Sequence, residues 1–428
     1  MPMEAAPAIL DPGAGAFAAM GSTLFRRVRV FDGTQRLDAT DVLVRDGRIA
    51  EVGGRAVRAA GQRSEVVDGQ GRQTLLPGLI DAHTHIVEGA LARALRFGVT
   101  TELDMANPPV LIRAAKTEYE DPSTPPTADV RSAGAAATVP GGHGTQFFPG
   151  VPTLRSPGEA AGFVADRVAE GSDYLKIHYA DGVPRGRGPV PVLDPPTVAA
   201  LATAAHERGL LAVAHVGTLA AAVEALTAGV DGLAHVFADA QPADPDTGPI
   251  AEFAALAAER QAFLVPTLTM IDMYAGGTGI CDLADDPALA PLLSDEDRQL
   301  LGRQRSGANP ALPLYPESAA TGVRAAVAAG VPILAGTDMV FALHGAALHR
   351  ELELLVAAGL STAQALTAAT ATPARAFGLD DRGRIAPGLR ADLLLVDGDP
   401  LADIRCTRAI AGVWQRGAQV SARPVLAR

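Results

Sequence analysis

The sequence predicts an α/β protein in which a (β/α)8 TIM barrel carries a small β-sandwich domain formed by both ends of the chain. Throughout the middle of the chain, apolar strand candidates alternate with alanine-rich helix candidates, a pattern typical of a parallel sheet covered by helices. Both ends instead show short segments of alternating apolar and polar residues, broken by Asp-Gly and Gly-Gly turns. Such segments are typical of antiparallel strands.

The ends of the chain are interpreted as a leader and one small domain. The first 22 residues contain no Lys or Arg, whereas a secretory signal begins with positive charge. Residues 1–22 are therefore interpreted as a flexible leader on a cytoplasmic protein. Residues 23–73 and 382–428, with segments such as LFRRVRVFDG and RADLLLVDGD, are predicted to form the β-sandwich domain.

Residues 74–381 are predicted to form the barrel, because eight parallel strands, each followed by a helix, close such a structure. The alternative is an open doubly wound sheet, but no Gly-x-Gly-x-x-Gly follows the first strand. The long connection 272–330 is interpreted as an insertion and a candidate lid. The strand candidates are 75–86, 100–105, 130–138, 174–179, 211–216, 232–236, 262–270 and 332–339.

Composition excludes several classes of partner. The 36 basic and 48 acidic residues give a net charge of −12, which disfavours nucleic acid because its phosphate backbone is also anionic. No charge-free run of about 18 apolar residues occurs, so no membrane span is expected. The expected partner is a small-molecule substrate, and the protein is expected to be a homo-oligomer.

Five candidate metal ligands, together with one lysine, occupy the carboxyl ends of predicted strands. In a barrel these ends converge on one mouth, where barrel enzymes place their catalytic groups. Converging imidazole and carboxylate groups are typical ligands of Zn²⁺ or a similar divalent ion. The candidates are His83 and His85 in the first strand, His215 in the fifth, His235 in the sixth and Asp338 in the eighth, and Lys176 lies in the fourth.

These segments resemble the amidohydrolase superfamily. The matching pieces are PGLIDAHTHI, two AHV segments, AGTDM, LTAATATPARAFGL and GRIAPGLRADLLLVDGDPL. YLKIH, AHVGT, VPTL and GTDM are closest to the binuclear prolidase-like and imidazolonepropionase-related branch. Members that deaminate rings usually carry a glutamate three residues after the fifth-strand histidine, where this chain has Thr218.

The resemblance implies a binuclear metal centre. His83 and His85 match the ligands of the more buried ion, with Asp338 as its further ligand. His215 and His235 match the ligands of the second ion. The implied cofactors are two divalent metal ions, with Zn²⁺ as the first expectation and Mn, Co or Fe as alternatives.

Lys176 matches the lysine that, in many members of the superfamily, reacts with CO₂ and bridges both ions as a carbamate. An ammonium group cannot bind a cation, whereas a carboxylated lysine offers two anionic oxygens. The alternative is an unmodified lysine that forms a salt bridge or binds substrate beside one metal ion.

The predicted function is hydrolysis of an amide-type C–N bond in an N-acyl amino acid, a dipeptide or a related small molecule. Two ions about 3.5–4 Å apart would lower the pKa of a shared water from about 15.7 toward 7. The resulting hydroxide attacks the carbonyl, and Asp338 acts as the general base that passes the proton to the leaving amine. The alternatives are hydrolysis of a cyclic amide, carbamate, urea or ester by the same centre, and a non-catalytic scaffold protein.

Four further residues are candidate substrate-binding residues because they follow strands at the expected mouth. One of them lies in a glycine-rich loop, where a ligand can approach closely. Arg185 and Arg187 could hold a substrate carboxylate, but a solvated loop is the favoured interpretation for them. The four candidates are His143 after the third strand, His178 and Tyr179 after Lys176, and His344 after the eighth strand.

Overall fold

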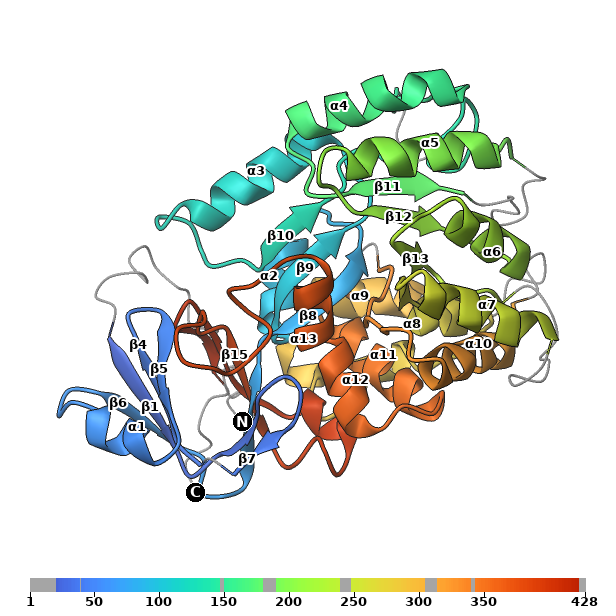
Figure 1. Ribbon diagram of the computed structural model, residues 1–428. Coiled ribbons are helices and arrows are strands. Elements are labelled where there is room, and N and C mark those ends of the chain that lie inside the picture. Colours follow the sequence, from blue (N-terminus) through green and yellow to red (C-terminus); the bar gives the residue numbers. More distant parts are fainter. Residues whose placement is uncertain are drawn as a thin grey trace, which may run out of the picture.

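The structure is a computed structural model, and Figure 1 shows a β-rich part beside a larger part in which helices surround parallel strands. Of the expected leader 1–22, only the last two residues are described, and Ser22 already begins the first strand. The structure describes residues 21–38, 40–146, 150–179, 190–238, 248–304, 314–339 and 343–422.

The β-rich part consists of two sheets, with strand orders β5-β4-β1-β6 and β17-β16-β15-β7-β2-β3. Phe25 and Trp414, one from each sheet, pack edge to face with ring centroids 4.8 Å apart within a buried apolar cluster that both sheets share. The strands are β1 Ser22–Arg26, β2 Arg29–Phe31, β3 Arg36–Leu37, β4 Val42–Arg45, β5 Arg48–Val52, β6 Glu65–Asp68, β7 Gln73–Pro77, β15 Leu393–Asp397, β16 Ile410–Gln415 and β17 Ala418–Ala422, and helix α1 is Gly54–Ala59.

Strand β7 ties the two ends of the chain together. It pairs with β15 in antiparallel register, with Leu75 opposite Leu395, and in parallel with β2. The sheet therefore continues to Pro77, although the sequence placed residues from 74 onward in the barrel. Strand β8 begins only two residues later, at Leu79.

The parallel strands form a three-stranded sheet, β10-β9-β8, and a four-stranded sheet, β11-β12-β13-β14. Isolated parallel bridges join Ala137 to Ile177, Leu264 to Ile333 and Thr84 to Met339. The expected eighth strand, 332–339, is present through such bridges rather than as a regular strand. The strands are β8 Leu79–Thr84, β9 Val99–Asp104, β10 Asp129–Ser132, β11 Leu175–His178, β12 Ala212–His215, β13 Gly232–Ala234 and β14 Phe263–Val265.

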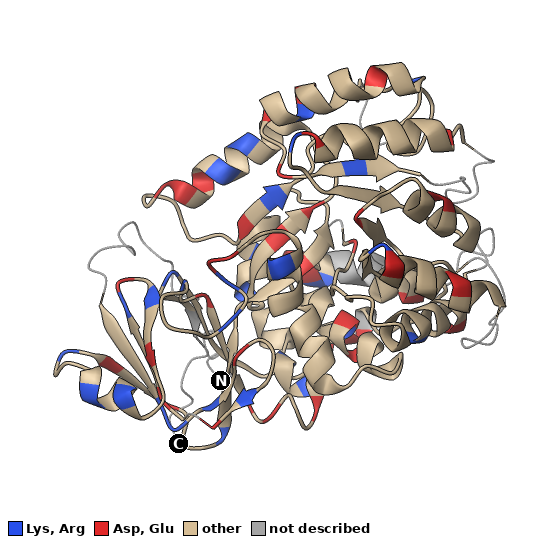
Figure 2. Cartoon of the chain, viewed as in Figure 1, with Lys and Arg blue, Asp and Glu red and all other residues tan. Residues whose placement is uncertain are grey.

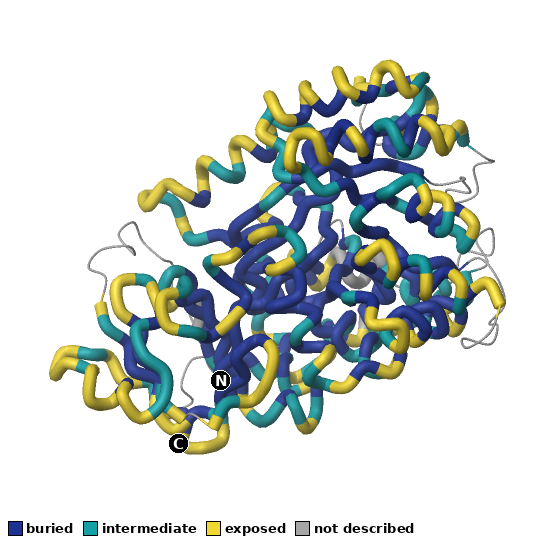
Figure 3. Tube along the Cα trace, in the orientation of Figure 1, coloured by how far each residue is buried: buried dark blue, intermediate teal, exposed yellow. Residues whose placement is uncertain are grey.

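Helices cover the outer side of these strands, which are buried along their length in Figure 3. Alanine, the strongest helix former, recurs in most of them. The helices are α2 Ala90–Arg96, α3 Pro109–Glu120, α4 Ala160–Glu170, α5 Pro195–His206, α6 Leu219–Thr227, α7 Gly248–Glu259, α8 Leu268–Tyr274, α9 Asp295–Gln304, α10 Pro316–Ala328, α11 Ala346–Ala357, α12 Thr362–Ala368 and α13 Ala371–Ala376. Short 3₁₀ helices are η1 Pro157–Glu159, η2 Cys281–Ala284, η3 Ala290–Leu292 and η4 Ile404–Arg408.

Side chains of the parallel strands divide between two apolar clusters, because successive residues of a strand point to opposite sides. Leu79 and Leu233 belong to the large core shared with the helices. Ala82, Val213 and Ala234 belong to a smaller cluster on the other side of the strands. The candidate metal ligands lie next to this inner cluster, toward the carboxyl ends of the strands.

The described part of the expected lid is packed into the large core and against α2. Leu283 and Leu289 are fully buried in the large core. Asp297, also fully buried, lies 2.6 Å from Arg93 Nε and 3.3 Å from Arg96 Nη1 on α2. The lid interpretation is therefore wrong for residues 272–304 and for α10, and residues 305–313 lie outside the described ranges.

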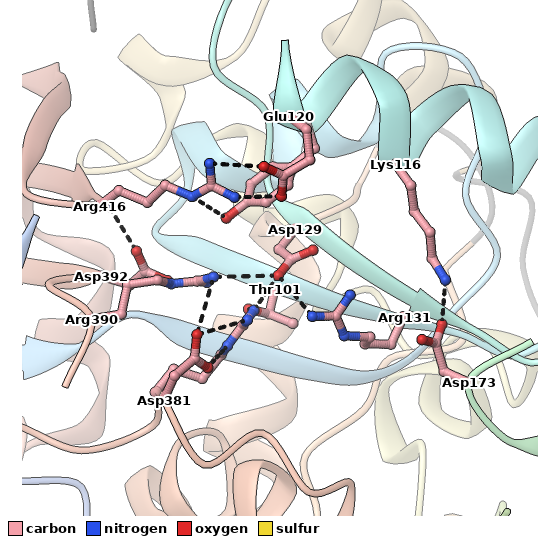
Figure 4. A network of polar contacts seen from close by, with 12 residues as sticks. Thr101, Lys116, Glu120, Asp129, Arg131, Asp173, Asp381, Arg390, Asp392 and Arg416 are labelled. Carbon is pink, nitrogen blue, oxygen red and sulfur yellow. Dashed lines mark hydrogen bonds and ion pairs between the residues drawn. The ribbon is translucent and has the colours of Figure 1, made fainter. Parts of the chain in front are cut away.

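A polar network fixes the β-rich part against the beginnings of β9 and β10 (Figure 4). Arg382 and Asp129, both almost fully buried, form an ion pair at its centre. Arg382 Nη1 also donates to Thr101 Oγ1 at 3.0 Å, and Arg390 Nη1 lies 3.4 Å from Asp129 Oδ2. Breaking one partner of such a buried pair costs about 3–5 kcal/mol, because the other charge is left without a partner.

Acidic and basic residues are interspersed over both parts of the chain (Figure 2). Among the described residues, no helix has the length and apolar character needed to cross a bilayer.

Candidate metal centre

The candidate ligands extend the inner cluster at the carboxyl ends of the strands. Lys176 follows Tyr174 of that cluster by two residues, and His215 follows Val213 in the same way. Side chains two residues apart in a strand share a side. The register of β11 and β12 also places His178 directly beside His215.

Local departures from regular strand geometry turn His83 and His235 to the side of the strands on which Lys176 and His215 lie. Ala82 and Ala234 already point into the inner cluster, so the residues that follow them would point outward in a regular strand. The register between β8 and β9 shifts between Asp81 and Thr84, and such a bulge re-aims the side chains beside it. His235 has a left-handed backbone with φ of 72°, which costs about 1–3 kcal/mol and is typical of functional sites.

Six of the nine histidines of the chain form one continuous group. Their ring centroids lie close enough for a metal ion to contact several imidazoles at once. The centroid distances are 5.4 Å for His83–His85, 4.8 Å for His83–His235, 4.3 Å for His215–His235, 4.6 Å for His143–His215 and 4.8 Å for His143–His178.

Asp338 lies at one side of this group of histidines. Its Oδ1 lies 3.3 Å from His83 Nε2 and 3.2 Å from His85 Nε2, and these three residues could hold a metal ion. Burial alone would raise the pKa of Asp338, but His83 and His85 hold that pKa well below its ordinary value. The carboxylate is therefore anionic, as a metal ligand must be.

The segment that carries Asp338 lies unusually close to β8. The backbone N–H groups of Thr337 and Asp338 both donate to the His83 carbonyl, at 3.2 and 2.8 Å. A Cβ atom on Gly336 would lie 2.8 Å from His83 Cβ and 2.4 Å from Val265 Cγ1, so only glycine fits. Asp338 itself has φ of 55°, which explains why the expected eighth strand is not a regular one.

Hydrogen bonds fix which ring nitrogen faces the centre. His85 Nδ1 lies 3.2 Å from the Ala106 carbonyl, which can only accept, so Nδ1 carries the proton and Nε2 has its lone pair free. His235 Nδ1 lies 2.7 Å from Thr267 Oγ1. Such outer partners orient the ligands of metal sites.

The histidines are held neutral, mainly by burial. Burial and the nearby Lys176 charge lower the pKa of His83 to about 3, and burial takes the pKa of His215 and His235 well below the ordinary value. His85 differs, because burial lowers its pKa but contact with Asp338 outweighs this and leaves the pKa raised. Neutral imidazoles are the form that binds metal ions.

Lys176 is buried at the centre of this group, and its Nζ has no hydrogen-bond partner among the described residues. Burial lowers its pKa to about 7, although Asp338 acts in the opposite direction. A buried ammonium without a partner is costly, so the amine needs either neutrality or conversion to another group. Neutral imidazoles, an anionic carboxylate and an unpartnered amine together fit a site for divalent metal ions.

Of the expected substrate-binding residues, His143 and His178 lie beside the ligand group. His178 Nδ1 lies 2.9 Å from the His143 carbonyl, and the two rings pack edge to face with each other. His178 is therefore protonated on Nδ1, because the carbonyl can only accept, and burial lowers its pKa well below the ordinary value.

Tyr179 and His344 do not reach this group. Tyr179 follows His178 directly, so it points to the opposite side of the strand, where its hydroxyl donates to Glu224 of α6. His344 is fully buried, with Nδ1 3.0 Å from both carboxylate oxygens of Glu102. Contact of either residue with a substrate therefore stays a prediction from the sequence, and Arg185 and Arg187 lie outside the described residues.

Two residues that support the centre were not identified from the sequence. Thr267, with φ of 52°, holds His235 and begins α8. Glu351, fully buried on α11, accepts hydrogen bonds from Leu268 N at 3.0 Å and from Thr269 N and Oγ1, both at 2.7 Å. Glu351 therefore holds the beginning of α8, and with it the partner of His235.

Replacing Glu351 by glutamine is expected to change how stability depends on pH. Burial raises the pKa of Glu351 to about 7 against the donors that lower it, so the folded protein favours the protonated carboxyl. Its contribution to stability is complete below the unfolded pKa of about 4.5 and is lost as pH rises through about 7. The stability of the wild type relative to Glu351→Gln should therefore fall by up to about 3 kcal/mol between pH 4.5 and 8, measured by urea unfolding.

Glu353→Gln is the matched control, because Glu353 lies on the same helix but pairs with Arg350, at 3.4 Å, and with Arg408. The control should show no such pH-dependent difference from the wild type. The same pH dependence in both variants, or in neither, would contradict the role assigned to Glu351.

Comparison with known proteins gives four findings. A model of the Amidohydrolase family matches residues 74–420. An imidazolonepropionase from Cereibacter sphaeroides (strain ATCC 17029 / ATH 2.4.9) is 28% identical over 404 residues, which cover 87% of this chain and 92% of that protein. Adenine deaminase 2 from Shouchella clausii is 32% identical over 139 residues, covering 27% of this chain and about a quarter (24%) of that protein.

Among solved structures, a Xaa-Pro dipeptidase with bound methionine has a TM-score of 0.71 at 20% sequence identity. The match covers 93% of this chain and 99% of the dipeptidase chain, which shows a shared fold.

Proposed function

Because the chain belongs to the amidohydrolase family, we propose that it is a metal-dependent hydrolase that cleaves an amide-type C–N bond in a small molecule. The observation that carries this proposal is the group of converging histidines around the unpartnered Lys176 amine, with the Asp338 carboxylate at its edge. A non-catalytic scaffold protein would have no need of these strained and tightly supported residues.

In this proposal the parallel strands close into an eight-stranded barrel. The two parallel sheets account for seven strands, and the segment 332–339 is the eighth. Three bridges support closure, because Ala137–Ile177 joins the first sheet to the second, and Leu264–Ile333 and Thr84–Met339 join the eighth segment to both. All candidate ligands then lie at the same mouth.

Two divalent ions would share the ligand group. His83, His85 and Asp338 would hold one ion, as their mutual distances allow. His215 and His235, whose ring centroids are 4.3 Å apart, would hold the second. Carboxylated Lys176 would bridge both, and its neutral amine is the form that attacks CO₂, forming a carbamate and releasing one proton. Zn²⁺ suits these ligands, as do Mn, Co or Fe.

When bound, such ions supply hydroxide at neutral pH and polarise the scissile carbonyl. Asp338 would take the proton of the attacking water, because its depressed pKa keeps it anionic and its Oδ1 lies 3.3 Å from His83 Nε2 and 3.2 Å from His85 Nε2. It then passes that proton to the leaving nitrogen as the C–N bond breaks. His178, protonated on Nδ1, offers Nε2 as an acceptor for a substrate N–H.

N-acyl amino acids and dipeptides are the first proposed substrates, supported by the fold shared with a Xaa-Pro dipeptidase. The second candidate class is cyclic amides, carbamates, ureas or esters, favoured by the similarity to an imidazolonepropionase, whose name denotes a ring. A homo-oligomeric, cytoplasmic protein remains a prediction from the sequence.

Metal content tests the proposal. Protein purified without chelator should contain about two equivalents of divalent metal per chain, measured by elemental analysis, and should hydrolyse at least one member of a panel of N-acyl amino acids and dipeptides. Removing the metal should abolish turnover, and adding Zn²⁺ should restore it.

His215→Ala should lose about one equivalent of metal. His206→Ala should retain both, because His206 is half-exposed and lies 2.8 Å from Asp231 on the outer surface. No bound metal after reconstitution, or equal metal content in the two variants, would overturn the proposed centre.

A further inference from the structure

We propose that the substrate of this centre carries an uncharged ring or branched alkyl group of about the size of benzene, which binds in an apolar pocket beside His178. This inference rests on the proposed hydrolase function and specifies its substrate class. The pocket has a volume of about 140 Å³.

The walls of the pocket come from the two connections that follow β9 and β10, together with His178 at the end of β11. Most of the described side chains that line it are small and apolar, which leaves room for a substituent and gives it only hydrocarbon to contact. They are Ala106, Pro108, Ala135, Ala136, Val151 and Pro152.

The pocket adjoins the candidate metal centre directly. His178 lines the pocket, and its ring centroid is 5.7 Å from that of His215. On the other side, Ala106 lines the pocket while its carbonyl holds His85 Nδ1 at 3.2 Å. A substrate with its scissile bond at the metal ligands would therefore place one substituent here.

The side chains of Asn107 and Thr138 in the wall already have partners. Asn107 Nδ2 donates to the Ile86 carbonyl at 3.2 Å and also to Asp104. Thr138 Oγ1 donates to the His143 carbonyl at 2.9 Å. No charged side chain is among the described residues of the lining. A carboxylate or ammonium group would lose its hydration here and find no oppositely charged side chain among these residues, so the pocket selects an uncharged group.

The volume sets the size of that group. A protein cavity of about 150 Å³ lined by apolar side chains binds benzene, so the present pocket accommodates one six-membered ring or a branched chain of similar size. Backbone close to His178 limits it on one side, since a Cβ atom on Gly144 would lie 2.8 Å from His178 Cε1. Larger, fused rings would not fit.

The experiment measures binding of 4-fluorobenzamide and of acetamide to the metal-loaded protein by ligand-observed NMR. The wild type should bind the aryl amide more tightly than acetamide. Ala136→Leu, which fills the pocket, should weaken binding of the aryl amide roughly tenfold or more, as the loss of one well-fitted apolar contact does, and should leave acetamide binding unchanged. Ala136→Val should give an intermediate loss, which keeps the test decisive where the leucine variant fails to fold.

Ala114→Leu on the exposed side of α3 is the matched control and should bind both amides as the wild type does. Equal aryl binding in Ala136→Leu and the control, or no preference for the aryl amide in the wild type, would overturn the pocket assignment. If the protein binds two equivalents of metal, either of these contradicting results would overturn the pocket assignment alone and leave the hydrolase proposal standing. Aryl-selective binding by a protein that takes up no metal would overturn the hydrolase proposal instead.

Discussion

Asp338→Asn is expected to lower kcat by about 10²- to 10⁴-fold, the usual contribution of a general acid–base group. The carboxylate is the anionic group within reach of both His83 Nε2 and His85 Nε2. An asparagine of the same size can still fill the space and offer one oxygen, but it cannot accept the proton of the attacking water. The measurement is kcat and KM on whichever panel substrate the wild type hydrolyses, with metal content determined in parallel.

Asp166→Asn, on the exposed surface of α4, is the matched control and should keep wild-type turnover. A large loss of kcat in Asp338→Asn at unchanged metal content would separate proton transfer from metal binding. Turnover close to that of the wild type would exclude Asp338 as the base.

Lys176→Met is expected to have the second large effect, namely the loss of one metal equivalent and of nearly all activity. Methionine matches the buried stem of Lys176 but can form no carbamate, so the two ions would lose their shared anionic ligand. Loss of an outer partner of a metal ligand costs 10–100-fold in metal affinity, and loss of a bridging ligand should cost at least about as much. Titration with Zn²⁺ measures this.

The composition of the chain makes the carbamate itself easy to detect, because Lys116 and Lys176 are its only lysines. Lys116 lies partly exposed in an ion pair with Asp173 at 2.7 Å (Figure 4), so it serves as an internal control. Protein reconstituted with ¹³C-bicarbonate and Zn²⁺ should give one carbamate signal, absent in Lys176→Met and present in Lys116→Met. No signal in the wild type would exclude the bridge.

The sequence was sufficient to predict which histidines and which aspartate lie together, because each stands at the end of an apolar strand candidate. It was not sufficient to say how His83 and His235 face the centre. That depends on a register shift at Asp81–Thr84 and on a left-handed residue, and neither has a recognisable signature in this sequence.

The other differences between the predictions from the sequence and the structure arise from contacts between segments far apart in the chain. His344 is buried because Glu102 lies opposite it, a pairing across more than two hundred residues that no local pattern shows. The pocket beside His178 likewise depends on the connections after β9 and β10 meeting the end of β11. The candidate lid is held instead by Asp297 against α2, and the sequence gives no sign of which helix a buried aspartate will contact.

The pairing of β7 with β15 has a consequence for synthesis of the protein. On the ribosome, Leu75 emerges long before Leu395, its neighbour in the sheet. The unpaired edge of β7 must therefore wait for almost the whole chain to be translated, and exposed edges of this kind invite aggregation. Synthesis that stops before β15 would therefore leave this edge of β7 unpaired, next to the strand that carries His83.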